Sequence, residues 1–154
     1  MTRFMPPQIT KDYLLDTEIG KEISFIIPID KQERIDMYYN FIEIYSPLQI
    51  NDEFFIAEDI TIPEDSCFQW KDVEAKYTTP EQSRFHGVVI DVRVEKVADI
   101  NARNIKKDIK SFNKGYVRTL VSQHNEIHNT NIEPSIYNYV FYVTIRRLRC
   151  QTYY

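Results

Sequence analysis

The C-terminal half of the sequence contains a strand pattern, a long helical pattern and a second strand pattern, and this order restricts the fold more than any other feature. Residues 87–97 read GVVIDVRVEKV, in which apolar and more polar positions alternate. Such alternation is typical of a strand in an antiparallel sheet with one buried face. The expected apolar face carries Val88, Ile90, Val92 and Val94. Residues 136–149 are apolar on both faces, which predicts a strand in the interior of a sheet.

A helix from near Asp99 to about Gln123 is predicted between these strands. At 100° per residue, its apolar side chains fall within an arc of about 80°, which indicates a face packed on the core. These side chains are Ala98, Ala102, Ile105, Ile109, Phe112, Tyr116 and Leu120. Gly115 would lie inside this helix at a cost of about 1 kcal/mol relative to alanine.

The N-terminal half carries shorter signals. Residues 1–20 resemble an arm, with Pro6 and Pro7 before a short helix that Gly20 would close. Residues 22–27 predict a strand, and residues 31–45 predict a helix that Pro47 ends. Two short strands separated by Pro63 are expected between residues 51 and 74.

These elements predict an α+β fold. A chain of 154 residues with 43% hydrophobic content can bury one core, so we expect residues 21–154 to form a single domain. The predicted architecture is a mainly antiparallel sheet covered on one face by the long amphipathic helix, with residues 1–20 as an N-terminal arm.

Charge is divided unequally along the chain. Residues 1–83 hold 17 Asp and Glu against 7 Lys and Arg, whereas residues 84–154 hold 6 against 12. A molecule with two oppositely charged poles attracts partners of either sign, including copies of itself.

Two sets of residues are the candidate interaction surfaces. The cations on one side of the long helix, together with three at the chain's end, form the basic candidate for a protein partner or nucleic acid. They are Arg103, Lys106, Lys107, Lys110, Lys114, Arg118, Arg146, Arg147 and Arg149. The acidic candidate interface contains Asp52, Glu53, Glu58, Asp59, Glu64 and Asp65.

Several catalytic classes lack their required residues. Gly20, Gly87 and Gly115 are too far apart for a P-loop or a dinucleotide-binding turn, and no G-x-S-x-G motif is present. We therefore expect no catalytic residue and no cofactor.

His124 and His128 have the spacing of two metal ligands on one helix. In the zinc hydrolase motif a glutamate directly follows the first histidine, but Glu126 comes two positions later and would point away. The preferred interpretation is a pair of polar histidines at a helix end, and no metal site is predicted.

The leading functional hypothesis is a non-enzymatic structural subunit that self-associates, or binds other proteins, through its opposed acidic and basic faces. A homo-oligomeric virion component, such as a bacteriophage neck or tail ring protein, is its most concrete form. The first alternative is an accessory nucleic-acid-binding protein that uses the basic helix stripe. The second, least favoured alternative is a metal-dependent hydrolase at His124 and His128.

The sequence also bears on compartment. Cys67 and Cys150 are too few for a disulfide scaffold, which favours a reducing, cytoplasmic or virion setting. No stretch reaches the roughly 18 apolar residues of a spanning helix, and the N-terminus lacks the apolar region of a secretory signal. We therefore expect neither a membrane partner nor secretion.

Overall fold

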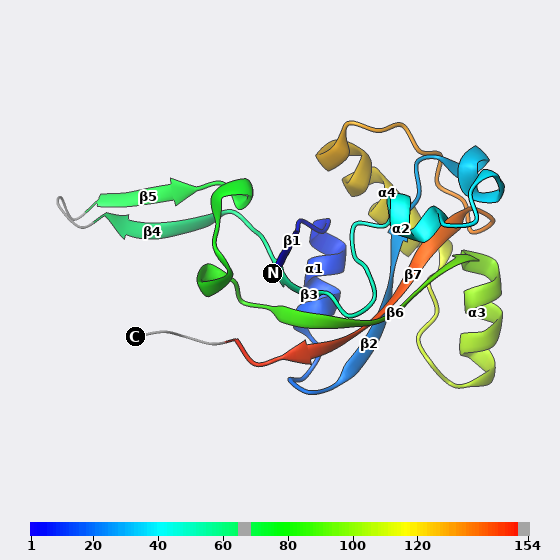
Figure 1. Cartoon of the computed structure of the whole chain (residues 1–154), viewed down its shortest axis with the longest axis horizontal. Helices are drawn as coiled ribbons and strands as arrows, with labels where there is room; N and C mark the ends of the chain where they lie inside the picture. The colour runs from blue at the N-terminus through cyan, green and yellow to red at the C-terminus, as the bar shows by residue number, and fades with distance from the viewer. Residues whose placement is uncertain (65–68, 151–154) are drawn as a thin grey trace.

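A computed structural model of the chain describes residues 1–64 and 69–150. Expectations placed on Asp65 and Cys67 lie outside these residues. The α+β fold is confirmed, because helices pack on a mainly antiparallel sheet. Figure 1 shows the arrangement of the elements.

The strands are β1 (Thr2–Phe4), β2 (Glu22–Pro28), β3 (Glu53–Ile56), β4 (Ile60–Glu64), β5 (Gln69–Val73), β6 (His86–Lys96) and β7 (Tyr139–Leu148). The α-helices are α1 (Gln8–Leu15), α2 (Phe41–Tyr45), α3 (Val97–Lys106) and α4 (Lys114–His128). Short 3₁₀ turns are η1 (Gln32–Met37), η2 (Ala75–Tyr77) and η3 (Pro80–Gln82).

The five-stranded sheet has the order β1-β3-β6-β7-β2. Only the short β1 runs parallel to its neighbour, and the other adjacent pairs are antiparallel. At the centre, β6 and β7 pair from His86 opposite Leu148 to Lys96 opposite Tyr139. The end of β6 that leads into α3 therefore lies at the opposite end of the sheet from the end of β7.

A bulge changes the face that β6 presents to the core. The pairing with β7 shifts between Val89 and Asp91, and Ile90 is exposed at this point. Val89 and Val92 are both buried, although they lie on opposite faces in a regular strand. The expected apolar face is therefore wrong at Val88 and Ile90 and right at Val92 and Val94, because the extra residue reverses the alternation.

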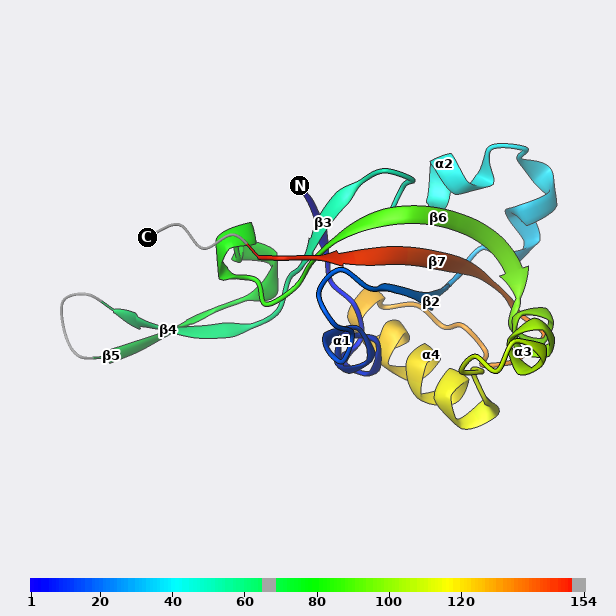
Figure 2. The same ribbon diagram turned by 90° about the horizontal axis from the view of Figure 1, so that it is seen from below.

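Helices cover both faces of the sheet. Figure 2 shows α1 and α4 on one side of β2, β6 and β7, with α2 and η1 on the other side. On the α4 side, Val117, Leu120 and Val121 form one buried cluster with Ile26 of β2 and Val140 of β7. The long amphipathic helix that covers one face is thus α4, as expected from the fold class.

The single helix predicted from 99 to 123 is wrong, because the chain turns between α3 and α4. Asp108 takes a left-handed backbone conformation (φ 55°). The Asn101 side chain donates to the carbonyl oxygen of Phe112 and accepts from its N–H, both at 2.7 Å. The Asn104 side chain donates to the carbonyl of Lys110 at 3.0 Å. These amides satisfy the backbone of the turn and make the helix break stable.

The helix predicted over 31–45 is also interrupted. The chain forms η1, passes through an extended Tyr38 (φ −130°) and then forms the five-residue α2. Phe41 is buried and lies 5.7 Å from the Phe141 ring, centroid to centroid. This tertiary contact on β7 outweighs the helical spacing of the surrounding apolar residues.

The predicted N-terminal arm packs against its own chain. β1 pairs with β3, and α1 follows Pro7 and buries Leu14 in the core. A separate projection is formed by the hairpin of β4 and β5, the hairpin arm, which extends beyond the five-stranded sheet along the long axis of the molecule (Figure 1).

Candidate assembly surfaces and a histidine-lined cavity

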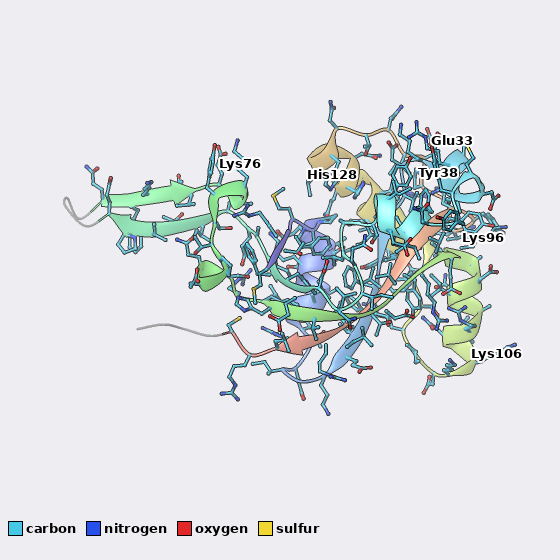
Figure 3. All side chains as sticks on the ribbon, in the orientation of Figure 1. Glu33, Tyr38, Lys76, Lys96, Lys106 and His128 are labelled. Atoms are coloured by element: carbon cyan, nitrogen blue, oxygen red, sulfur yellow. The ribbon has the colours of Figure 1, made fainter. Side chains whose placement is uncertain are left out.

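Cations gather around α3 and the beginning of α4, which we call the basic end. Between residues 96 and 118 the sequence has seven Lys and Arg against two Asp. Lys106 and Lys107 are exposed at the end of α3, and Lys114 and Arg118 are exposed on the first turns of α4. Figure 3 labels Lys96 and Lys106 at this end, opposite the hairpin arm.

Two of the predicted basic residues in the helical region, Arg103 and Lys110, have partners within the chain. The Arg103 guanidinium donates two hydrogen bonds to the Glu95 carboxylate, one of them 2.6 Å long. This pairing lowers the pKa of Glu95, with the hydrogen bond as the main cause. The Lys110 ammonium lies 4.5 Å from the centre of the Tyr13 ring, a cation–π contact. The basic residues therefore do not form one uninterrupted helix stripe.

Arg146, Arg147 and Arg149 do not join the basic end, because β7 ends at the opposite end of the sheet. Arg146 pairs with Glu22 at 2.7 Å. The Arg147 guanidinium donates to the carbonyl oxygens of Leu15 and Thr17. Arg149 is exposed. The expected reinforcement of the helix cations by these arginines is absent.

The predicted acidic residues are divided between internal and external positions. Glu58 accepts two hydrogen bonds from Arg84, each 2.7 Å, and Lys11 lies 3.8 Å away. Asp52 accepts from the N–H of Gln49, and Asp59 accepts from the N–H of Ala75. Glu53 is exposed at the beginning of β3, which leaves Glu64 as the predicted residue on the described strands of the hairpin arm.

The hairpin arm is nevertheless acidic among its described residues. On β4 and β5, Glu64 and Asp72 stand against Lys71; at the base of the arm, Asp59 and Glu74 add two carboxylates, and Lys76 pairs with Glu74 at 3.3 Å. The arm and the basic end therefore have opposite charge and lie at opposite ends of the long axis (Figure 1).

Exposed apolar side chains accompany both charged ends. Trp70 on the hairpin arm is 71% exposed. At the basic end, Ile105 is 72% and Ile109 is 53% exposed. The sequence pattern placed both isoleucines in the core. α3 instead buries Val97, Ile100 and Asn104, which leaves Ile105 on its outer side, and Ile109 follows the end of the helix.

A cavity of about 470 Å³ lies between the N-terminal segment, the end of β2, α2 and the end of α4. Its apolar wall includes Phe4, Ile27, Phe41 and Phe141. Its polar side includes Arg3, Thr10, Asp30, Lys31, His124, His128 and Thr130. A largely apolar cavity of this size with a few polar groups is typical of a small-ligand site.

The two histidines of α4 lie against each other at this cavity. Their ring centres are 4.4 Å apart, and His124 is only 9% exposed. Burial, with a smaller effect from His128, lowers the pKa of His124 to about 4. Burial also lowers the pKa of His128. Both effects favour the uncharged imidazole at neutral pH. Figure 3 shows His128 at the end of α4.

Sequence reasoning missed this cavity because its walls come from separate segments. The helical spacing of His124 and His128 was the one local signal. Asp30 is also on the wall, but no group of three or more His, Cys, Asp or Glu that could hold a metal ion occurs among residues 1–64 and 69–150.

Comparisons with known proteins identify no relative. No family model matches the sequence, and neither a curated protein nor a solved structure matches it. Within the described part of the chain, no helix is both long enough and apolar enough to cross a membrane.

Proposed function

We propose that this protein is a non-enzymatic structural subunit that assembles head to tail, with the hairpin arm of one copy against the basic end of the next. The observation that carries this proposal is the separation of the acidic arm from the basic end along the molecule's long axis (Figure 1). Because two different surfaces meet, the contact is heterologous, and repetition gives a closed ring or a filament.

The isolation of the hairpin arm supports the proposal. β4 and β5 form a separate two-stranded sheet, joined to each other by pairs such as Ile62 with Lys71. A two-stranded hairpin without further packing is only marginally stable in water. Docking on a neighbour would bury its exposed surface and stabilise it.

Apolar and charged groups match at the two ends. Trp70 is the kind of large aromatic side chain that anchors protein interfaces, and Ile105 and Ile109 offer apolar surface beside Lys106 and Lys107. Charge complementarity would then set the register and exclude contacts between like ends.

Assembly as a virion component, such as a bacteriophage neck or tail ring, is one form that the proposal allows. Nucleic-acid binding through Lys106, Lys107, Lys114 and Arg118 is the second candidate, since these cations are exposed together. Self-assembly is preferred because it also accounts for the acidic arm and for the exposed isoleucines, which phosphate binding does not require.

Charge-swapped copies test the proposed contact. One variant carries Lys106→Glu and Lys107→Glu at the basic end, and the other carries Glu64→Lys and Asp72→Lys on the hairpin arm. Each variant alone would place like charges together and remain monomeric by light scattering. An equal mixture would assemble, because the reversed arm fits the reversed end and the unchanged surfaces still fit each other.

The control carries Lys21→Glu and Arg149→Glu, which change the net charge as much as the basic-end variant but lie beside the end of β7, at the opposite end of the sheet. This control would assemble like the original protein. Assembly of both swapped variants by themselves, or failure of their mixture to assemble, would contradict the proposed contact. If the basic-end variant lost binding to a DNA or RNA oligonucleotide but self-associated like the original protein, nucleic-acid binding would be favoured.

A further inference from the structure

The histidine pair on α4 is not used by the proposed assembly contact. His124 and His128 lie on the cavity wall, away from the hairpin arm and α3. No hydrogen bond joins either imidazole to another group in the described part of the chain. His124 is 9% exposed, and its ring nitrogens are not among the buried side-chain atoms that lack a partner, so they remain accessible at the cavity that the side chain lines.

The ring centres lie slightly closer together than a shared ion requires. With metal–nitrogen distances of about 2.0–2.1 Å, two imidazoles bound at about 90–109° place their ring centres roughly 4.5–5.3 Å apart. The observed separation is 4.4 Å. A small side-chain rotation, which the exposed His128 can make, brings the two rings to this range.

The helix end adds favourable electrostatics. His124 and His128 lie in the last turns of α4, which ends at Asn129 in a left-handed conformation (φ 52°). The backbone dipoles place partial negative charge at a helix C-terminus, which stabilises a cation there. Asp30 supplies the one carboxylate on the described cavity wall, although its oxygen is shared with Lys31 at 3.5 Å.

We propose that His124 and His128 together bind one divalent transition-metal ion, represented by Zn²⁺, at the wall of the cavity. The pair provides two ligands. Among the described residues, no third His, Cys, Asp or Glu side chain joins them to complete a group of three. The other coordination positions face the cavity, where water or a small ligand would complete the shell. Nitrogen ligands select such ions over Mg²⁺ and Ca²⁺, which prefer oxygen.

This site differs from a zinc hydrolase motif. Glu126 is exposed and lies outside the cavity wall, so the motif supplies no general base beside the ion. The proposal is therefore binding, with no reaction attached to it. A bound ion would lie between the end of α4 and the cavity that Phe41 and Phe141 line.

Calorimetric titration of the chelator-treated full chain with ZnCl₂ tests the proposal. One ion per chain is expected, and Mg²⁺ should give no heat of binding. His128→Gln, at an exposed position that should not disturb folding, should weaken Zn²⁺ binding at least about tenfold. Changes to outer-shell partners already cost 10–100-fold, so the loss of a direct ligand should cost no less. His124→Gln should have the same effect.

Glu126→Gln is the matched control, because it lies between the two histidines but should leave Zn²⁺ affinity unchanged. Zn²⁺ should also raise the unfolding temperature of the original chain, and this rise should vanish in His128→Gln. Absence of Zn²⁺ binding, or equal affinity in the original chain and in His128→Gln, would overturn the proposal. Neither result depends on assembly, which is measured separately.

Discussion

The Arg84 guanidinium donates two hydrogen bonds, each 2.7 Å, to the Glu58 carboxylate, and this pair closes the base of the hairpin arm. Glu58 comes just before β4, and Arg84 comes just before β6. The Ser83 hydroxyl donates to the carbonyl of Ile56 at 2.6 Å and strengthens the same junction. The arm therefore leaves the sheet from a fixed base.

Removing the charge of Glu58 should loosen this base. Glu58→Gln replaces a bidentate ion pair with a weaker contact, and we expect a loss of about 1 kcal/mol in the free energy of unfolding. Urea unfolding measures this change. Glu64→Gln, on the exposed arm, is the control and should have almost no effect. Equal stability of the two variants would show that the pair does not fasten the arm.

Two ion pairs should make stability depend on acid pH. Hydrogen bonds from arginine lower the pKa of Glu58 and Glu95 below the ordinary value of 4.5. These two carboxyl groups therefore bind protons more readily in the unfolded chain than in the folded one. Both pairs stabilise the fold above about pH 4.5. This stability is lost as the pH falls through the lowered pKa values.

Urea unfolding between pH 7 and pH 3 checks the acid dependence. The double variant Glu58→Gln, Glu95→Gln should be less stable at pH 7 and should lose less stability on acidification. A parallel loss in both proteins would mean that other carboxyl groups control the acid transition.

The turn between α3 and α4 should depend on one amide. Asn101→Ala removes both side-chain hydrogen bonds to the backbone of the buried Phe112. Leaving those groups unpaired should cost about 1–3 kcal/mol in the free energy of unfolding. Thermal or urea unfolding would detect it. Ala102→Ser, at the exposed neighbouring position, should cost far less, and similar losses would argue against this role for Asn101.

Two glycine substitutions should have opposite effects. A Cβ at Gly87 would lie 2.8 Å from the buried Phe54 ring, so Gly87→Ala should destabilise the fold by about 1–3 kcal/mol. A Cβ at Gly115 would meet only Asn113 Oδ1, at 3.4 Å, on the first turn of α4. Gly115→Ala should stabilise by up to about 1 kcal/mol. Unfolding curves that rank the two variants in reverse would contradict this packing.

Strands were easier to predict from the sequence than helices. The strands at 22–28, 86–96 and 139–148 follow patterns of apolar residues that burial in a sheet imposes. The helix over 99–123 failed because Asn101 and Asn104 stabilise a turn through contacts across it, which periodicity does not register. The bulge at Ile90 likewise depends on pairing with β7.

The candidate surfaces were predictable only in part. Local charge counts identified the acidic and basic segments, but internal partners of Glu58, Arg103 and Arg147 come from distant positions. The two ends became clear only when the hairpin arm and α3 were placed in space. The cavity beside His124 had no sequence signature, because separate segments form its walls.

The solution mass of the nuclease-treated protein at about 50 mM and 500 mM salt tests head-to-tail assembly most directly. The Debye screening length shortens from more than 10 Å to a few Å over this range, so contacts between exposed charges weaken. We predict a species of several chains at low salt that dissociates at high salt. The proposed assembly would be contradicted by a monomer at both salt concentrations, if the mixture of the two charge-swapped variants is also monomeric at the same protein concentration.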